Sequence, residues 1–497
     1  MKSKHWLALT ILLVAVGVGI RFYRLTQPPL DFHPTRQYRS LLLARTLYLR
    51  WRPGPISPEE VAQRAAGFRV ALHEPVLFET LVARTYLLLH GECPWVARLY
   101  DLAFWLFGAL GLWMLARRLG GPAGAAVAVG YWMLLPLAIA ASRSFQPDPL
   151  MVSLLPWVAY GWFRWVEDGH ARWLIWAGLA GLLAGIVKVH AVFFFGGMAL
   201  GAAWGRRGWK FWREVRWWGV VVGILLLVAG IYLKIRPGQW VSFYVSTWTL
   251  RMARYWLTPL PYGGWLDMIV RNLGGGLTLA AAVGGLRSER PAQGFLSGWL
   301  LGYLAYGFLV PVQIATHSYY HLPMVPWVAL GLALTVRLLT PWVRSWPRGA
   351  QAVGAVLMLL AAVYPVGITY WEMRSHDYRA QAAMYAEIGR RLPPREKVVA
   401  LTEAYGWPLL YHGGVPSVRW PSQDQKRLFD KQGQFAALFR SLVKAQDAAF
   451  FVVTDWEELN HQGNLRRYLR QCYPVWVETA TYVIFDLRKE NAQCAVP

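Results

Sequence analysis

The sequence predicts a polytopic α-helical membrane protein of about eleven transmembrane helices with a C-terminal α/β domain. About eleven apolar stretches follow one another over residues 6–370, each near the ~20 residues that cross a bilayer as a helix. The 497-residue chain is 56% hydrophobic and only 16% charged, which is too apolar for an ordinary soluble domain. Residues 371–497 then alternate helical and strand patterns. We therefore expect two domains, 1–370 and 371–497.

Charged or turn-forming residues separate the predicted spans. In chain order the spans cover residues 6–20, 97–115, 122–141, 149–166, 173–187, 191–204, 217–233, 267–286, 295–311, 322–338 and 350–370. Lys2 and Lys4 precede the first span, and no small-residue cleavage site is evident, so we expect this span to be retained. Many of the 29 Trp residues flank the spans, as in interfacial aromatic belts.

Alternate loops differ strongly in charge. One set is rich in cations: Arg117, Arg118, Arg164, Arg172, Arg206, Arg207, Lys210, Arg213, Arg216, Arg287, Arg290, Arg337, Arg344 and Arg348. The positive-inside rule places that set, and the N-terminus, in the cytoplasm. The C-terminal domain and the long loops 21–96 and 234–266 are then extracytoplasmic. Loop cations beside anionic headgroups explain the net charge of +24 better than nucleic-acid binding does.

The long first loop contains two amphipathic patterns, residues 38–49 and 77–89, which predict helices lying in the membrane interface. In the C-terminal domain we expect helices at 379–392, 434–445 and 456–471, and strands at 397–401, 450–454 and within 475–487. Cys472 and Cys494 would be able to pair if this domain is extracytoplasmic, and both the paired and the free state stay open.

Polar residues from several loops are predicted at one depth, the outer membrane face. They are Asp31, His33, Arg36, Gln37, His73, Glu74, Glu79, Arg98, Asp101, Arg143, Asp148, Lys188, His190, His317, Tyr319, Tyr320 and His321. Ionisable groups at membrane depth are costly and usually functional. A transporter would tend to place them near the bilayer midplane instead.

Asp31 follows the first span in Pro28-Pro29-Leu30-Asp31. A carboxylate fixed here can accept a proton from an alcohol. The alternative is a helix-capping Asp before Pro34. The nearby His33, Arg36 and Gln37 favour a site.

Asp148 lies in a tight hinge between two spans, where Asp is also a common turn or capping residue. Arg143 is a candidate structural partner for it. Lys188, followed by His190, ends a Gly-rich span; it is either a snorkelling lysine or a phosphate-binding cation. Arg254 is a further phosphate candidate.

His317 and His321 are four residues apart, a spacing that suits metal ligands on a helix. Pro323 follows closely and no acidic ligand is adjacent, so we expect no metal there.

These motifs, taken in order, resemble the GT-C superfamily of lipid-dependent glycosyltransferases, in particular its protein-mannosyltransferase and aminoarabinose-transferase branch. The resemblance spans residues 6 to about 340. It rests on Pro28-Pro29-Leu30-Asp31, Glu74-Pro75-Val76-Leu77-Phe78-Glu79, GECPWVARL at 91–99, Ser142-Arg143…Pro147-Asp148, the Gly-rich run 178–188 ending in Lys, and Tyr319-Tyr320-His321-Leu322-Pro323…Pro326.

The resemblance implies an inverting transfer of one sugar from a polyprenyl-phosphate donor to a lipid, glycan or protein hydroxyl, with Asp31 as the catalytic base. It also implies a bacterial or archaeal plasma-membrane enzyme with no organic cofactor. Phe32 stands where the family commonly has a second acid, which leaves the donor sugar and any divalent metal requirement open. Two alternative functions stay open. One is a lipid-linked glycan ligase or polymerase, and the other is a lipid or glycan transporter or flippase.

Overall fold

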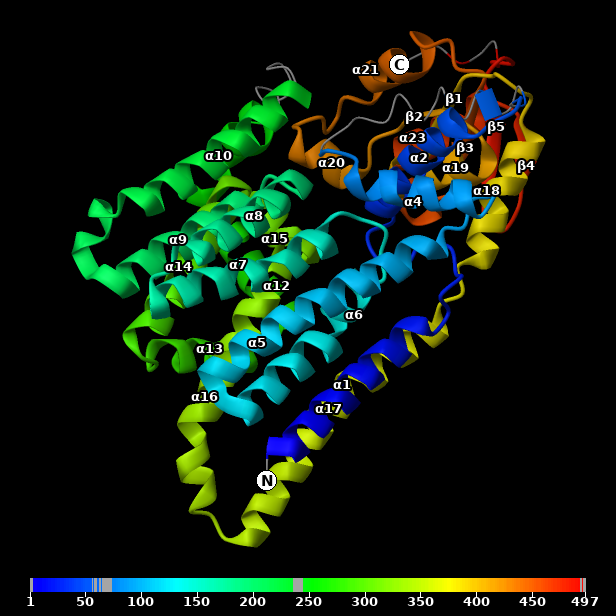
Figure 1. Ribbon diagram of the computed structural model, residues 1–497. Helices are drawn as coiled ribbons and strands as arrows, with labels where there is room; N and C mark the ends of the chain where they lie inside the picture. Colours follow the sequence, from blue (N-terminus) through cyan, green and yellow to red (C-terminus); the bar gives the residue numbers. More distant parts are fainter. Residues whose placement is uncertain are drawn as a thin grey trace. The chain divides into compact units, whose positions relative to one another are not determined.

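The computed structural model describes residues 3–55, 57, 60–61, 64, 74–235, 245–491 and 494 (Figure 1). The chain divides into two compact units. The first comprises residues 1–26, 72–78 and 95–376, and the second comprises residues 27–71, 79–94 and 377–497. The first-loop segments thus belong to the same unit as the C-terminal segment.

The first unit is a bundle of helices that coincide with the predicted apolar spans. They are α1 (Ser3–Phe22), α5 (Trp95–Leu134), α6 (Pro136–Ala141), α7 (Asp148–Asp168), α8 (Ala171–Val187), α9 (Ala191–Arg207), α10 (Val215–Ile235), α12 (Leu260–Ile269), α13 (Gly275–Leu286), α14 (Arg290–Leu309), α15 (Pro311–Thr316), α16 (Val325–Arg344) and α17 (Arg348–Ser375). α5 contains the predicted span 97–115 and the first part of the span 122–141, whose last residues form α6. The two spans meet where Gly121 has non-helical torsions (φ 69°, ψ −170°) before Pro122, a helix-breaking residue. His73 lies outside the described residues, as does part of the predicted outer loop 234–266.

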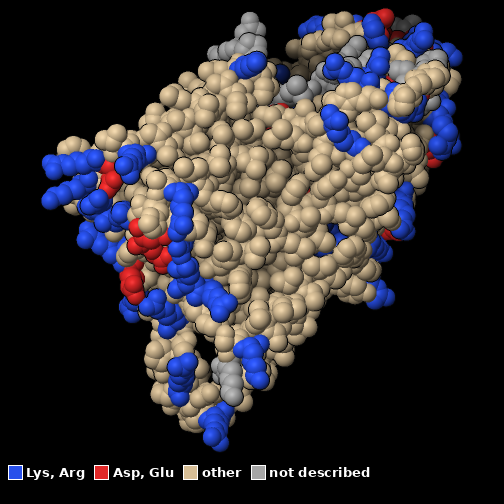
Figure 2. All heavy atoms as spheres, in the orientation of Figure 1, with Lys and Arg blue, Asp and Glu red and all other residues tan. Residues whose placement is uncertain are grey.

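Several helices of the first unit present apolar side chains outward. Leu226 of α10 is 67% exposed, and Leu357 and Tyr364 of α17 are 60% and 71% exposed. In the described part of the chain, six helices are long and apolar enough to cross a membrane. Figure 2 shows a broad tan surface with Lys and Arg gathered near its edges. Exposed apolar side chains on a surface with few charged residues are stable in lipid rather than in water, and they mark an integral membrane protein.

Glycines allow α9 and α14 to pack backbone against backbone. A Cβ built on Gly298 of α14 would lie 2.1 Å from the carbonyl oxygen of Gly197, and one built on Gly201 would lie 2.1 Å from that of Gly294. Small residues drive close helix packing in membranes, where lipid weakens the hydrophobic drive between helices. The Gly-rich sequences of these two spans therefore determine which helices become neighbours.

We expect Gly298→Ala to destabilise the protein because the added methyl group cannot fit without separating the two helices. Overpacking of this kind costs about 1–3 kcal/mol. Gly223→Ala in α10 is the matched control, since a Cβ there meets nothing within 4 Å. Thermal unfolding in detergent should show a lower midpoint for Gly298→Ala alone; equal midpoints for the two variants would contradict this packing.

The second unit is built on a five-stranded sheet with strand order β2-β1-β3-β5-β4. β1 (Val398–Leu401) pairs in parallel with β2 (Ser417–Arg419) and β3 (Phe450–Val453), whereas β5 (Val483–Asp486) runs antiparallel to β3 and β4 (Val475–Glu478) antiparallel to β5. β1, β3 and β5 are fully buried, as apolar central strands covered on both faces are expected to be. The three predicted strand regions are confirmed, and β2 was not predicted.

The other elements of the second unit are helices, which come from both the C-terminal segment and the first loop. The C-terminal helices are α18 (Arg379–Arg391), α19 (Trp407–Gly413), α20 (Gln423–Leu428), α21 (Phe435–Phe439), α22 (Trp456–His461) and α23 (Gly463–Cys472). The helix predicted at 456–471 is divided at Gln462. The two first-loop helices are α2 (Pro34–Trp51) and α4 (Leu77–Leu88). α2 is buried along most of its length and packs against α19; its location at the membrane interface stays a prediction.

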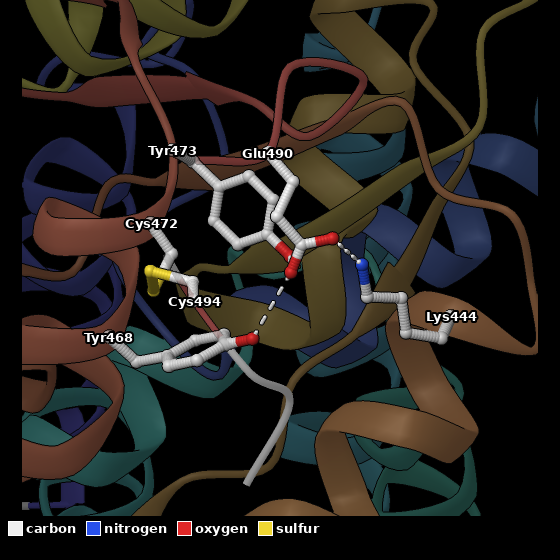
Figure 3. Close-up of a disulfide and its surroundings, with 6 residues drawn as sticks. All are labelled: Lys444, Tyr468, Cys472, Tyr473, Glu490 and Cys494. Carbon is white, nitrogen blue, oxygen red and sulfur yellow. Dashed lines mark hydrogen bonds and ion pairs between the residues drawn. A yellow bond between two sulfur atoms is a disulfide. The ribbon is translucent and has the colours of Figure 1, made fainter. Parts of the chain in front are cut away.

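Cys472 and Cys494 form a disulfide (Figure 3), so the paired state left open by the sequence is the one observed. Glu490 lies beside it, accepts a hydrogen bond from Tyr473 Oη (3.0 Å) and pairs with Lys444. Lys444 holds the pKa of Glu490 below its usual value although burial opposes this. The disulfide fastens Cys494 to the last residue of α23, and the ion pair fastens Glu490 to Lys444.

Candidate functional site

Asp31 lies in a turn that leads into α2. Gln37, fully buried in the first turn of α2, donates from Nε2 to Asp31 Oδ1 (3.1 Å) and to the carbonyl oxygen of Phe32 (2.7 Å). His33, with a left-handed φ of 45°, occupies the N-cap, and Pro34 begins the helix. Asp31 is therefore not the helix cap, which removes the structural alternative that the sequence left open. The side-chain amide of buried Gln37 thus orients one carboxylate oxygen of half-buried Asp31.

Asp148 and Lys188 form a buried ion pair within the first unit. Asp148 begins α7, directly after Pro147, and Lys188 ends α8; each residue is only 2% exposed. Lys188 Nζ donates to Asp148 Oδ1 and lies 5.3 Å from the ring centroid of Tyr319. A snorkelling lysine would reach the surface, whereas this one is held inside by a carboxylate. Asp148 thus has Lys188 as an ion-pair partner.

Aromatic side chains surround the Lys188 end of α8. Tyr306 of α14 stacks on Tyr320 (centroids 5.6 Å apart, planes 7° apart), and the His190 ring lies 4.9 Å from that of Tyr306. Tyr319 lies against Tyr320 at 4.6 Å. Tyr319 and Tyr320 belong to η5 (Ser318–Met324). Residues from α14, η5 and the N-cap of α9 thus make an aromatic wall beside a buried cation. Tyr306, within an apolar span, carried no sequence signal.

Arg143 supports the polypeptide that leaves α1. Its Nη2 donates to the carbonyl oxygens of Tyr23 (2.9 Å) and Arg24 (3.3 Å), and Arg98 donates to those of Arg24 (3.2 Å) and Leu25 (2.8 Å). Cations at a helix C-terminus neutralise its exposed carbonyl groups and its dipole. Arg143 and Arg98 therefore fix the path of the chain shortly before Asp31.

His321 is fully buried in a chain of hydrogen bonds. Trp265 donates to Tyr303 Oη (2.6 Å), which lies 2.6 Å from His321 Nδ1, while His321 Nε2 lies 2.9 Å from the carbonyl oxygen of Ile314. When His321 carries its proton on Nε2, the bonds run in one direction. Tyr303 then donates to Nδ1 of His321, and Nε2 donates to the carbonyl oxygen of Ile314. Both ring nitrogens are occupied, so His321 packs the bundle rather than facing a ligand, and it is not available as a metal ligand with His317.

Glu74, Arg36 and Arg254 are further predicted site residues. Glu74 is half-buried. Tyr232 donates to the carbonyl oxygen of Ile186, two residues before Lys188. Arg36 lies in the first turn of α2. Arg254 is exposed in η3 (Arg251–Leu257). In the part of the chain that the structure describes, no three His, Cys, Asp or Glu side chains gather as a metal site requires.

The second unit contains a polar network that the sequence did not suggest. The Arg45 guanidinium of α2 donates from Nε to Glu92 (2.9 Å) and from Nη1 to the carbonyl oxygen of Tyr411, and it lies 3.7 Å from the Tyr411 ring centroid. Tyr411 Oη donates to Glu92 (3.0 Å), and Tyr38 Oη lies 2.7 Å from His412 Nε2. Tyr38 directly follows Gln37. α19 thus anchors α2, the helix that carries Gln37, which donates a hydrogen bond to Asp31.

This network predicts acid sensitivity. Burial and the Arg45 charge lower the pKa of His412 from 6.5 to about 4, so the folded protein keeps this ring neutral where the unfolded chain protonates it. The unfolded state therefore binds more protons between pH 6.5 and 4, and stability falls as pH drops through that range, by up to about 1.4 kcal/mol per pH unit. His412→Gln should flatten the dependence of the unfolding midpoint on pH, and exposed His461→Gln should not. An unchanged slope in His412→Gln would contradict the assignment.

The comparisons with known proteins agree with this architecture. Residues 73–232 match the sequence model of the family described as dolichyl-phosphate-mannose-protein mannosyltransferase. This segment contains Glu74, Arg143, Asp148 and Lys188. No curated protein matches the chain in a sequence search.

Two solved structures share the fold over nearly the whole chain. ArnT from Cupriavidus metallidurans, bound to undecaprenyl phosphate, aligns with a TM-score of 0.57 at 15% identity, covering 96% of this chain and 97% of that one. The archaeal oligosaccharyltransferase AglB from Archaeoglobus fulgidus, in complex with an inhibitory peptide and a dolichol-phosphate, aligns with a TM-score of 0.60 at 10% identity, covering 98% and 75%.

The fold is therefore that of the GT-C glycosyltransferases. Together with the match to the mannosyltransferase family over 73–232, this confirms the resemblance that the ordered sequence motifs indicate.

Proposed function

We propose that this protein is a membrane glycosyltransferase. It moves a single sugar from a polyprenyl-phosphate donor to an acceptor hydroxyl on the extracytoplasmic face of the membrane, with inversion at the sugar carbon. The proposal is carried by Asp31, a carboxylate oriented by a buried glutamine and not used as a helix cap. Undecaprenyl phosphate in ArnT and dolichol-phosphate in AglB support a lipid phosphate as the donor's carrier.

Asp31 acts as the general base. It accepts the proton of the acceptor hydroxyl as that oxygen attacks the sugar carbon and the bond to the phosphate oxygen breaks. A positioned base contributes about 10²–10⁴ in rate. Gln37 holds the Oδ1 atom of Asp31 in place. The carboxylate therefore loses less orientational freedom when the transition state forms.

Lys188 stabilises the leaving phosphate. That group gains negative charge as the sugar departs, and a cation fixed in a site with little water stabilises it strongly. Asp148 orients Lys188 through their ion pair, and the aromatic wall of Tyr306, Tyr319 and Tyr320 limits water. Arg36 or Arg254 supplies a second cation. These side chains suffice for a monophosphate leaving group, and we expect transfer without an added divalent metal.

Transfer of a whole oligosaccharide is the second candidate, because AglB is an oligosaccharyltransferase with the same fold. The two functions are separated by incubating purified protein in lipid nanodiscs with radiolabelled polyprenyl-phosphate monosaccharides, using membranes of a strain lacking this protein as acceptor. We expect label in a new glycosidic bond. Transfer only from lipid-diphosphate oligosaccharides would favour the ligase, and lipid movement without bond formation would favour a flippase.

A further inference from the structure

A large cavity in the C-terminal part of the second unit has no role in the mechanism above. Its volume is about 1120 Å³. Its walls come from the end of α18, residues 393–398 leading into β1, the turn before α19, and the start of β2. Ligand pockets commonly enclose ~300–1,000 Å³, so this cavity is large enough for a short oligosaccharide.

One wall presents an aromatic surface. Tyr405 lines the cavity and is 48% exposed, although a large aromatic ring would normally be covered. The Arg419 guanidinium lies 3.7 Å from its ring centroid and fixes the ring's orientation. Trp407, two residues later, also lines the cavity. Rigid rings with a polar edge can pack against the apolar face of a sugar while its hydroxyl groups bond elsewhere.

The turn that carries Tyr405 is strained. Ala404, Tyr405 and Gly406 have φ values of 49°, 60° and 77° in succession. Non-glycine residues avoid this region, and such strain tends to persist where a site needs it. A Cβ on Gly406 would lie 2.9 Å from Ser417 Oγ, so the turn is pressed against β2. The strained backbone directs the Tyr405 ring toward the cavity instead of the core.

The cavity also carries positive charge. Arg395 and Lys397 line it and are exposed, while the intervening Glu396 is bonded to Arg488 (3.5 Å). Ser417 and Gln446 add neutral hydrogen-bonding groups. Arg395 and Lys397 therefore leave the cavity positively charged, because the Glu396 carboxylate is already paired with Arg488. Such a site favours an anionic ligand, since hydrogen bonds between a cation and a carboxylate or phosphate are strong.

We propose that this cavity binds a negatively charged saccharide, which stacks on Tyr405 and places its acidic group against Arg395 and Lys397. This inference rests on the proposed function, because it assigns the cavity to the acceptor: the C-terminal domain selects an acidic glycan that Asp31 then activates.

The test measures binding to the full-length protein in nanodiscs by isothermal titration, with trigalacturonic acid as the acidic probe and maltotriose as the neutral one. We expect the acidic probe to bind about tenfold or more tightly than the neutral one. Arg395→Gln/Lys397→Gln and Tyr405→Ala should each weaken it about tenfold, whereas the exposed Arg467→Gln should leave it unchanged. Circular dichroism melting verifies that the variants fold.

Equal binding of the two probes, no binding of either, or full binding by Tyr405→Ala would overturn the proposal. Asp31→Asn should bind the probe normally. If it does so but also transfers sugar at full rate, the proposed catalytic function fails while the saccharide site stands.

Discussion

Replacing Asp31 with Asn is expected to lower the rate of sugar transfer by about 10²–10⁴, because Asn cannot accept the proton of the attacking hydroxyl. The amide occupies the same volume as the carboxylate, and Gln37 is able to reorient its own amide to bond with it, so the fold should survive. The loss should therefore appear in kcat with little change in the donor KM. Radiolabel transfer from the donor lipid measures both constants.

Asp424→Asn is the matched control for this variant. Asp424 lies in the same unit, and its side chain is 94% exposed, so the substitution removes the same charge without touching the turn before α2. Transfer by Asp424→Asn should equal that of the native protein. Full-rate transfer by Asp31→Asn would exclude Asp31 as the base.

Lys188→Met should have the second large effect, and it should affect both activity and stability. Removing a donor that stabilises developing charge costs about 10²–10³ in rate. Asp148, only 2% exposed, would also lose its ion-pair partner, and breaking one side of a buried pair costs about 3–5 kcal/mol. Lys444→Met breaks a partly exposed pair with Glu490 and should change the unfolding midpoint much less.

The double variant Asp148→Asn/Lys188→Met separates the two roles of Lys188. It removes both charges, so no uncompensated ion stays buried and most of the lost stability should return. If Lys188 binds the leaving phosphate, transfer should stay as low as in Lys188→Met. Recovery of transfer together with stability would mean that the pair is only structural.

The helices and the central strands were predictable because their signals are local. Hydrophobic length identified the helices, and the apolar runs at 397–401 and 450–454 identified β1 and β3. β2 was missed because Ser417–Arg419 is short and only partly buried and lacks the apolar signature of a central strand. The helix is divided at Gln462, whose side-chain oxygen accepts hydrogen bonds from Trp420 and Lys426, and these distant partners could not be predicted from the local sequence.

The candidate site was predictable as a set of residue types but not as a set of partners. Asp148 and Lys188 were both candidates, yet their pairing joins residues 40 positions apart. The network that joins Glu92 to Tyr411 spans 319 positions. His321 is a further example, because its two ring nitrogens lie within hydrogen-bonding distance of Tyr303 and Ile314. Such assignments depend on tertiary contacts, which a single sequence does not contain.

The most direct test of the account is a cryo-EM structure of Asp31→Asn with a polyprenyl-phosphate sugar bound. We expect the donor phosphate within hydrogen-bonding distance of Lys188 Nζ, and residue 31 facing the sugar carbon from the side opposite the phosphate, with room for a hydroxyl group. A donor phosphate bound away from Lys188, or a sugar carbon inaccessible to residue 31, would contradict it.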